Sequence, residues 1–437
     1  MPLSLPGKVG LGLVVSYASY TAYIAVQAQL EISKRQRRYE EHKKGLKKAD
    51  QGDFDQIVDV PNRYETLNVA GRFENPFPEY RSQTILEFLL SRILELFEGK
   101  TRGGTPSSEA ELRRILPVVK PDLELIWSNH GVLKTGISDI EVDSKDLPPL
   151  KDRLTFTWLG QSCSFLQLSG ISFLTDPIFE DYLVNKALGP KRITPSPCKL
   201  EELPLPNFVL VSHDHPDHLE SESVKKLGNK CAWIVPLGVR KYLARKGVSN
   251  VIEMAWWDRI TLPVEGPDKY EVVCLPSMHW SGRYMLDANS TLWCSFMITK
   301  NGKSMFYHAG DTGYTPELFK LIREKLGPVH LSMLPIGQYC PQWHQKPRHI
   351  CPSEAIEIVK DLQSKKMVGV HWGTFVLSSE PFIEPKHKLE KLAEDMNRSK
   401  DIFAPTFGKT FVMDMSKSYE SSGEAREVRD GKAVLLD

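Results

Sequence analysis

The sequence predicts an α/β fold in which two β-sheets are flanked by helices. From residue 154 onward, apolar runs of strand length come first, and further strands then alternate with segments of helical spacing. A dense group of histidines and aspartates directly follows one of these runs, and α/β folds place their chemistry at the carboxyl ends of strands. We expect strands at 154–159, 164–168, 171–174, 208–211, 270–275, 292–299, 304–307, 331–334 and 367–370, and helices at 238–245, 316–325 and 353–362.

The overall composition is that of a globular protein. The 437 residues carry 56 Lys and Arg against 55 Asp and Glu, a net charge of +1, which argues against a nucleic-acid-binding protein with a basic surface. The seven cysteines include no CxxC pair, so we interpret them as reduced thiols, as is typical of a reducing compartment. The length suits one large domain or two ordinary ones.

Residues 1–30 are predicted to contain a transmembrane anchor. Residues 9–30 carry no charge, and a helix of that length rises about 33 Å against a hydrocarbon core of about 30 Å. The alternative is an amphipathic helix, because several Ser, Thr and Gln residues weaken the hydropathy. A cleaved signal peptide is disfavoured because the basic residues follow the apolar run, and a mitochondrial presequence because the first 33 residues contain one Lys and no Arg.

A basic collar and a polar linker are expected at 31–67. Eight Lys and Arg residues lie between 31 and 48, and directly after a span they would hold the next domain on the cytosolic side, against anionic lipid headgroups. A solvated extension of the helix is a compatible alternative. Residues 50–64 are interpreted as the linker.

We expect an extension at 68–150 before a catalytic domain at 151–415. Residues 82–97 have the spacing of an amphipathic helix, which either packs on the catalytic domain or borders a lipid entry groove. Residues 107–111 have the capping pattern that begins a short helix. Residues 416–437 are mostly polar and are expected to form a loosely held tail.

The sequence indicates a metal site. Three histidines and two aspartates fall within six positions, 213–218, although histidine accounts for only 12 of 437 residues, so a solvated polar loop is the weaker interpretation. Nitrogen and oxygen donors of this kind suit zinc or a similar ion. Three more candidates each follow a strand-like run, and converging strand ends would bring them to the same loop. The candidate ligands are His213, His215, Asp217, His218, His279, Asp311 and His371.

The order of these residues resembles the metallo-β-lactamase superfamily. Longer stretches resemble the family of N-acyl-phosphatidylethanolamine-hydrolysing phospholipase D, a membrane enzyme, over about 68–413. They are GRFENPFP at 71–78, WLG at 158–160, TDPIF at 175–179, GPKR at 189–192, SPC at 196–198, VPLG at 235–238, GDTGY at 310–314, PIG at 335–337 and HWGTF at 371–375. The resemblance implies an αββα sandwich, a homodimer, and two zinc ions per chain that activate water and hold the phosphoryl oxygens.

The resemblance also implies a role for each ligand. One zinc ion would be held by His213, His215 and His279, and the other by Asp217, His218 and His371. Asp311 would bridge the two ions.

Three further residues have predicted places near the metals. Asp176 ends a strand and precedes Pro177, a position suited to a carboxylate that orients a ligand histidine, although a turn-forming Asp-Pro is the alternative. His349 matches the family's further active-site histidine, which would contact phosphate or protonate the leaving alkoxide; a surface histidine is the alternative. His308 departs from the family pattern, and we expect it to be neutral and buried.

The expected function is hydrolysis of N-acyl-phosphatidylethanolamine to an N-acylethanolamine and phosphatidic acid. The ligands alone specify water activation and leave open a lactonase, a thioesterase or a nuclease. A membrane morphology or scaffold protein with a relict site is an alternative from another class. The expected location is a mitochondrial or other internal membrane, with the catalytic domain facing the cytosol.

Overall fold

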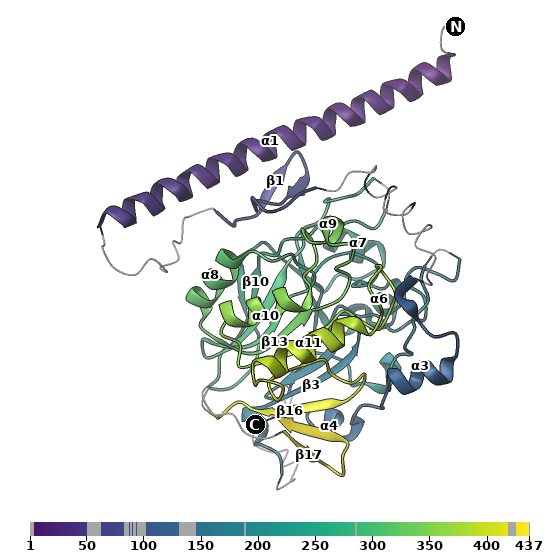
Figure 1. Cartoon of the computed structure of the whole chain (residues 1–437), viewed down its shortest axis with the longest axis vertical. Helices are drawn as coiled ribbons and strands as arrows, with labels where there is room; N and C mark the ends of the chain where they lie inside the picture. Colours follow the sequence, from purple (N-terminus) through teal and green to yellow (C-terminus); the bar gives the residue numbers. More distant parts are fainter. Residues whose placement is uncertain are drawn as a thin grey trace.

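The computed structural model describes residues 4–49, 63–82, 87, 90, 93, 102–130, 146–187, 189–284, 286–417 and 425–436. Two β-sheets pack face to face and helices cover their outer faces, so the predicted αββα sandwich is confirmed (Figure 1). The linker expected at 50–64 and the helix expected at 82–97 lie almost entirely outside the described residues.

The first sheet has the strand order β17-β18-β16-β3-β4-β5-β6-β7-β8. Strands β3 to β5 form an antiparallel meander, and β5 to β8 run parallel. The strands are β3 (Arg153–Gly160), β4 (Cys163–Leu168), β5 (Ile171–Thr175), β6 (Phe208–Leu210), β7 (Ala232–Pro236), β8 (Val251–Met254), β16 (Thr410–Asp414), β17 (Arg426–Val428) and β18 (Ala433–Leu436).

The second sheet has the order β15-β14-β13-β12-β11-β10-β9. Strands β9 to β12 are antiparallel and β12 to β15 are parallel. The strands are β9 (Arg259–Thr261), β10 (Tyr270–Leu275), β11 (Ser295–Lys300), β12 (Lys303–His308), β13 (Val329–Pro335), β14 (Lys366–Val370) and β15 (Ile402–Phe403).

The helices connect parallel strands and cover the sheets. Parallel neighbouring strands need such crossovers because the end of one strand and the start of the next lie at opposite edges of the sheet. Helices α8, α10 and α11 serve the second sheet, and α6 and α7 serve the first. The α-helices that the described residues form in the body are α3 (Glu109–Ile115), α4 (Leu123–Ser128), α6 (Ser221–Leu227), α7 (Arg240–Arg245), α8 (Pro316–Leu326), α9 (Gln342–Gln345), α10 (Pro352–Asp361) and α11 (Glu384–Asp395).

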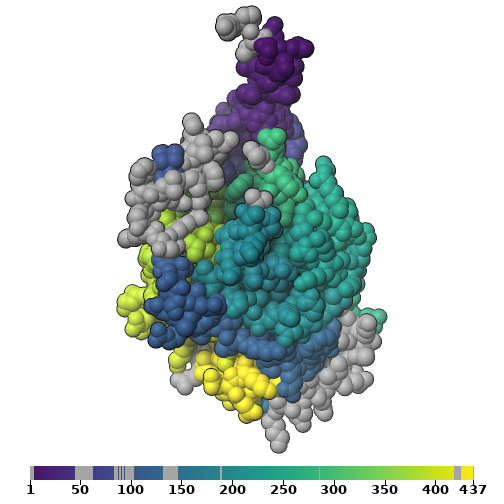
Figure 2. Space-filling model, turned by 90° about the vertical axis from the view of Figure 1, so that its right-hand side faces the viewer, coloured from purple at the N-terminus to yellow at the C-terminus, as the bar shows by residue number. Residues whose placement is uncertain are grey.

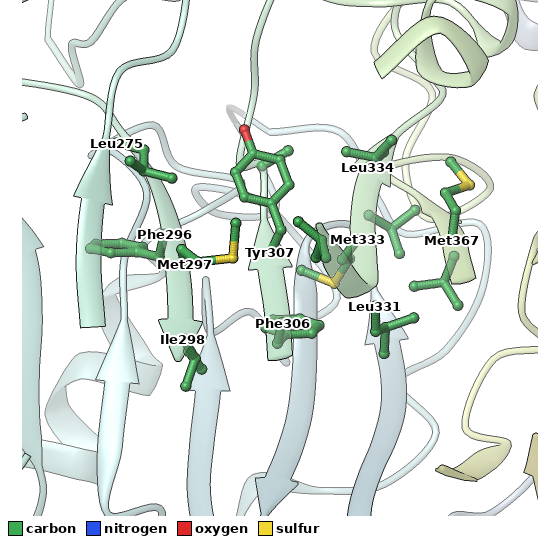
Figure 3. Close-up of a cluster of buried hydrophobic side chains, with 14 of the residues drawn as sticks. Leu275, Phe296, Met297, Ile298, Phe306, Tyr307, Leu331, Met333, Leu334 and Met367 are labelled. Carbon is green, nitrogen blue, oxygen red and sulfur yellow. The ribbon is translucent and has the colours of Figure 1, made fainter. Parts of the chain in front are cut away.

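The main hydrophobic core lies between the two sheets. Figure 3 shows labelled apolar side chains from β10 to β14 gathered in one cluster. Phe156 of β3 meets Phe306 of β12 with ring centroids 6.2 Å apart, which joins the two sheets. The strands are apolar on both faces because both faces of each sheet are covered. This packing fixes the strand ends that carry the candidate ligands.

Helix α1 (Leu5–Ala49) is continuous and lies along the body beside the β1–β2 hairpin (Figure 1). Strands β1 (Leu67–Val69) and β2 (Arg72–Glu74) form this hairpin. The Tyr20 hydroxyl donates to the Ala70 carbonyl at 2.9 Å, and the Arg35 guanidinium to the Glu65 carbonyl at 2.7 Å. Ile24 is buried as well. Part of residues 9–30, the segment predicted to span a membrane, therefore contacts the body.

The apolar side chains at the start of α1 are exposed. Leu5, Leu13 and Val14 are 76%, 68% and 66% exposed, and the first turns project clear of the body (Figure 2). By length and composition α1 is long and apolar enough to cross a membrane, with a mean hydropathy of 1.5 over 18 residues. It is a candidate anchor.

Outside the sandwich, one local prediction holds and one is wrong. Helix α3 begins as its capping pattern predicts, with Ser108 Oγ accepting from the Glu111 N–H at 3.4 Å. The loosely held tail predicted at 416–437 is wrong for residues 426–436, because β18 pairs in parallel with β16 and β17 pairs with β18. The run Ala433–Leu436 supplies the reason, since its apolar side chains are largely buried against the sheet edge.

Candidate metal centre

The structure brings all seven predicted ligands together at the carboxyl ends of β6, β10, β12 and β14. All seven are buried. Their ligand atoms form two groups, within each of which the atoms lie no more than 4.8 Å apart: His213, His215 and His279; and Asp217, His218, Asp311 and His371.

A close approach of two loops builds this site. Gly310 precedes Asp311 with a φ of 59°, and a Cβ at Gly310 would lie 2.5 Å from the Ser212 Cβ. Glycine is therefore required where the β12 loop meets the β6 loop. In the β6 loop the His218 N–H donates to the His215 carbonyl at 3.0 Å, which turns the chain so that both rings face inward.

Three imidazole nitrogens converge in the first group. His215 Nδ1 lies 2.7 Å from His213 Nε2 and 3.3 Å from His279 Nε2. Each of the latter two rings has its other nitrogen occupied, His213 Nδ1 by Ser212 Oγ at 2.9 Å and His279 Nδ1 by the Arg348 carbonyl at 3.0 Å. Burial and neighbouring imidazoles hold the pKa of His213 and His279 well below the usual value. These rings are therefore neutral, with lone pairs available to a metal.

The second group adds carboxylates. His218 Nε2 and His371 Nε2 are 3.2 Å apart, and Asp217 Oδ2 lies 3.6 Å and 3.5 Å from them. Burial alone would lower the pKa of His218, but the carboxylates of Asp311, Asp217 and Asp176 raise it well above the usual value. This half of the centre therefore favours positive charge.

Asp311 lies between the two groups. Its Oδ2 is 3.2 Å from His218 Nε2 and 3.7 Å from His279 Nε2, and its Oδ1 is 3.1 Å from His371 Nε2. Burial alone would raise its pKa, but the imidazoles of His371, His218 and His349 hold it well below the usual value. An ionised carboxylate in this place adjoins both groups of candidate ligands.

Asp176 lies in hydrogen-bonding contact with a predicted ligand. Its Oδ2 accepts from His218 Nδ1 at 2.8 Å, from Ser212 Oγ at 2.8 Å and from His308 Nε2 at 3.0 Å, while its Oδ1 accepts from the Ser212 N–H at 2.7 Å. Burial alone would raise the pKa of Asp176, but His308 and His218 lower it to about 2. The bond from His218 Nδ1 turns Nε2 of this ring towards Asp311. His308 is buried, as expected, and binds this carboxylate.

His349 is 3% exposed, which excludes the alternative of a surface histidine. Its Nδ1 lies 3.7 Å from Asp311 Oδ2, and its ring centroid is 5.1 Å from that of His279. Burial lowers the pKa of His349 well below the usual value. A neutral imidazole therefore borders the centre beside the proposed bridge.

The sequence analysis missed Gln161, in the turn between β3 and β4. Its Nε2 lies 2.9 Å from Asp217 Oδ2 and 2.8 Å from His371 Nε2. The only local signal is a polar residue directly after the predicted strand that ends in Trp158-Leu-Gly160. Asp214 lies in the ligand loop but is not one of the predicted ligands, and it accepts from the Gly282 N–H at 2.9 Å.

The donors present fit metal ions. Neutral imidazoles converge on one point, and ionised carboxylates adjoin imidazoles at distances from 3.1 to 4.0 Å, the combination that borderline divalent cations prefer.

Comparisons with known proteins agree with this geometry. Residues 172–372 match the family described as "Beta-lactamase superfamily domain". The chain is 46% identical over 366 residues to "N-acyl-phosphatidylethanolamine-hydrolyzing phospholipase D, mitochondrial" of Saccharomyces cerevisiae, and the match covers 80% of this chain and 78% of the relative. The chain belongs to this phospholipase D family. It thereby belongs to the metallo-β-lactamase superfamily, as the ligand order predicted.

Two further matches extend the comparison. The Caenorhabditis elegans "N-acyl-phosphatidylethanolamine-hydrolyzing phospholipase D 1" is 37% identical over 275 residues, which are 61% of this chain and 75% of the relative. A crystal structure of an isothiocyanate hydrolase from Delia radicum gut bacteria matches 59% of this chain and 98% of its own, with 16% identity and a TM-score of 0.48. The fold and the family make the chain a metal-binding hydrolase.

Proposed function

We propose that the protein is a zinc phosphodiesterase of the phospholipase D type, which hydrolyses N-acyl-phosphatidylethanolamine to an N-acylethanolamine and phosphatidic acid. The observation that carries the proposal is the complete, buried set of seven ligands in a chain 46% identical to a relative that bears this activity in its name.

Two zinc ions per chain are part of the proposal. His213, His215 and His279 would hold one ion, Asp217, His218 and His371 the other, and Asp311 both. When bound, zinc ions lower the pKa of water to about 7 and neutralise charge on the phosphoryl oxygens. Two cations held so close together repel each other, so an ionised carboxylate between them stabilises the pair.

The chain's own residues orient this centre. Asp176 fixes the His218 ring, and because the Ser212 hydroxyl donates to Asp176, its oxygen accepts from His213 Nδ1. The Arg348 carbonyl fixes His279 in the same way. Partners of this kind set the tautomer and the direction of each ligand. His349 lies beside Asp311, where its N–H reaches a phosphoryl oxygen or the leaving alkoxide.

Membrane association is the second part of the proposal. The exposed apolar side chains of α1 enter the lipid, and Arg37 and Arg38 of the collar remain exposed for anionic headgroups, each worth about 1 kcal/mol near such a surface. Arg35 instead is buried against the body. We propose a mitochondrial or other internal membrane with the catalytic domain on the cytosolic side, and a homodimer as the assembly.

A substrate panel tests the proposal. The purified, detergent-solubilised protein is incubated with N-acyl-phosphatidylethanolamine, a lactone, a thioester and a single-stranded oligonucleotide, and an Asp311→Asn preparation serves as the control for contaminating hydrolases. We expect phosphatidic acid and N-acylethanolamine in equal amounts from the wild type alone. Turnover of only one of the other substrates would replace this function with that of a lactonase, a thioesterase or a nuclease.

A further inference from the structure

A loop beside the metal centre carries two exposed apolar side chains at its tip. The loop joins β10 to β11, and its tip at 281–290 contains Tyr284 and Leu286, which are 65% and 69% exposed. Outside α1, no other large apolar side chain of the described residues is as exposed as these two. Single exposed apolar residues are common on protein surfaces, whereas a pair of this size on one tip indicates a contact surface.

Hydrogen bonds within the tip fix its shape. The Asp287 carboxylate accepts from the N–H groups of Arg283, at 3.1 Å, and Tyr284, at 2.8 Å. The Asn289 N–H donates to the Ser281 carbonyl at 2.9 Å, which closes the base of the tip. The exposure of the apolar side chains is therefore built into the fold. These N–H groups already have partners, as entry into an apolar phase requires.

The tip lies next to α1. The Arg72 guanidinium of β2 donates to the Leu286 carbonyl at 3.2 Å and to the Ala288 carbonyl at 2.9 Å. The same guanidinium lies 5.9 Å from the ring centroid of Tyr17 and 5.5 Å from that of Tyr20, both on α1. One arginine therefore connects the tip to the helix, through the β1–β2 hairpin that lies between α1 and the body (Figure 1).

These contacts mark the level at which α1 leaves the body. The apolar side chains before Tyr17 are exposed, among them Leu13 and Val14, and these turns are free to enter lipid. Tyrosines of membrane proteins collect at the boundary between hydrocarbon and headgroups, and Tyr17 and Tyr20 are such residues at the exit of the helix. The tip, with Tyr284, lies at this same level, where the bilayer surface is expected.

The loop also carries part of the metal centre. It begins after β10 with the candidate ligand His279 and with Trp280, whose ring meets that of His215 edge-on with centroids 4.4 Å apart. Asn75, directly after β2, donates to the His279 carbonyl at 2.7 Å. The tip, the hairpin and the ligands are thus connected, so a membrane contact at the tip sets the position of the metal centre relative to the bilayer.

We infer that Tyr284 and Leu286 insert into the leaflet that α1 enters and hold the metal centre at its surface. The partner is the phospholipid bilayer, and the tip is a second contact with it besides α1. A single helix leaves the body free to rotate about the helix axis, whereas two contacts direct one face of the body to the lipid. The inference rests on the membrane association proposed above and adds the face of the catalytic domain that meets the bilayer.

An environment-sensitive fluorophore tests the contact. It is attached to Leu286→Cys in the full-length protein, and the unsubstituted protein, whose own cysteines are buried or partly buried, is labelled in parallel as the blank. Both are reconstituted into phosphatidylcholine vesicles without substrate, with or without bromine atoms on the acyl chains. Bromine quenches a fluorophore only on contact, so we expect the emission at position 286 to fall in the brominated vesicles.

Leu205→Cys is the matched control for the fluorophore. Leu205 is 40% exposed but precedes β6, at the edge of the sheet opposite the ligands. A fluorophore at this position should lie in water and keep the same emission in both kinds of vesicle.

Turnover gives a second measurement. The double variant Tyr284→Ser/Leu286→Ser should hydrolyse N-palmitoyl-phosphatidylethanolamine in detergent micelles at the wild-type rate. In vesicles at low protein concentration it should be about tenfold slower, the effect of withdrawing about one large apolar side chain from lipid. Leu205→Ser should keep both rates.

The outcomes separate the inference from the proposed function. A fluorophore at position 286 that is not quenched, or is quenched no more than one at 205, overturns the inference, as does a double variant with the wild-type rate in vesicles. Emission at 286 that changes with protein concentration in detergent alone would assign the tip to contact between two copies of the chain and would also overturn it. A protein that inserts the tip but cleaves no substrate even in micelles refutes the proposed hydrolysis and leaves the membrane contact standing.

Discussion

Asp176→Asn is the variant that most directly tests how this centre is held. The substitution keeps the size of the side chain and replaces one carboxylate oxygen with an NH2 group. Asp176 accepts four hydrogen bonds, from the Ser212 N–H and hydroxyl, His218 Nδ1 and His308 Nε2, at 2.7 to 3.0 Å. Because three of them reach Oδ2, the amide oxygen takes that place, and the NH2 group faces the Ser212 N–H.

The expected loss of stability and of metal affinity follows from those contacts. The Ser212 N–H is then left without an acceptor, and the His218 and His308 ring N–H groups bond a neutral oxygen in place of a carboxylate. Each bond to a charged group is worth about 1.5–3 kcal/mol, and release of a buried carboxylate offsets part of the loss. We expect a net loss of about 2–4 kcal/mol in the free energy of unfolding. A neutral amide oxygen holds the His218 Nδ1–H less firmly than a carboxylate and makes the ring a weaker ligand, so metal affinity should fall about 10- to 100-fold.

The assay is zinc content by elemental analysis, combined with chelator competition and denaturant unfolding. Asp214→Asn is the matched control, since Asp214 is a buried carboxylate of the same loop that accepts from the Gly282 N–H and hydrogen-bonds no predicted ligand ring. It should leave zinc affinity unchanged. Wild-type zinc affinity and turnover in Asp176→Asn would refute the claim that this carboxylate orients His218.

Three other predictions concern the bridge, the neighbouring histidine and the helix. Asp311→Asn removes the charge between the two ligand groups and should abolish both zinc occupancy and turnover; normal rates would mean that another group bridges. His349→Ala should keep both zinc ions while lowering kcat about 100-fold, the usual effect of a proton donor, and loss of zinc would reassign it as a ligand. A chain beginning near Asp50 should keep its hydrolysis rate in detergent micelles but hydrolyse substrate in vesicles more slowly at low protein concentration. A second chain, beginning at Tyr17, lacks the first exposed turns of α1 but retains the Tyr20 and Arg35 contacts with the body, so it separates insertion into lipid from packing on the body. Equal rates of all three chains on vesicles would exclude a role of α1 in presenting the enzyme to its bilayer.

Much of the sandwich could be predicted from the sequence because apolar runs of strand length are local signals. The ligand loop at 213–218 is also local, and residue chemistry alone indicates metal there. His279, Asp311 and His371 were found for a related reason, since each directly follows a strand, and strand ends meet at one edge of a sheet. Several strands were missed, among them β7, β8, β9 and β16. The runs Val251–Met254 and Arg259–Thr261 are short and alternate weakly with polar residues, whereas β7 and β16 are mostly apolar runs that the prediction left out.

The sequence by itself determined which residues have metal chemistry and which strands precede them. Only the tertiary structure decided which side chains outside those patterns reach the centre. An amide has no distinctive signature, so Gln161 became a neighbour of Asp217 and His371 only when the β3–β4 turn packed against the loops after β6 and β14. His308 meets Asp176 across 132 residues of chain for the same reason. Periodicity and residue chemistry act over a few positions, whereas contacts between distant segments depend on the order in which the strands pair.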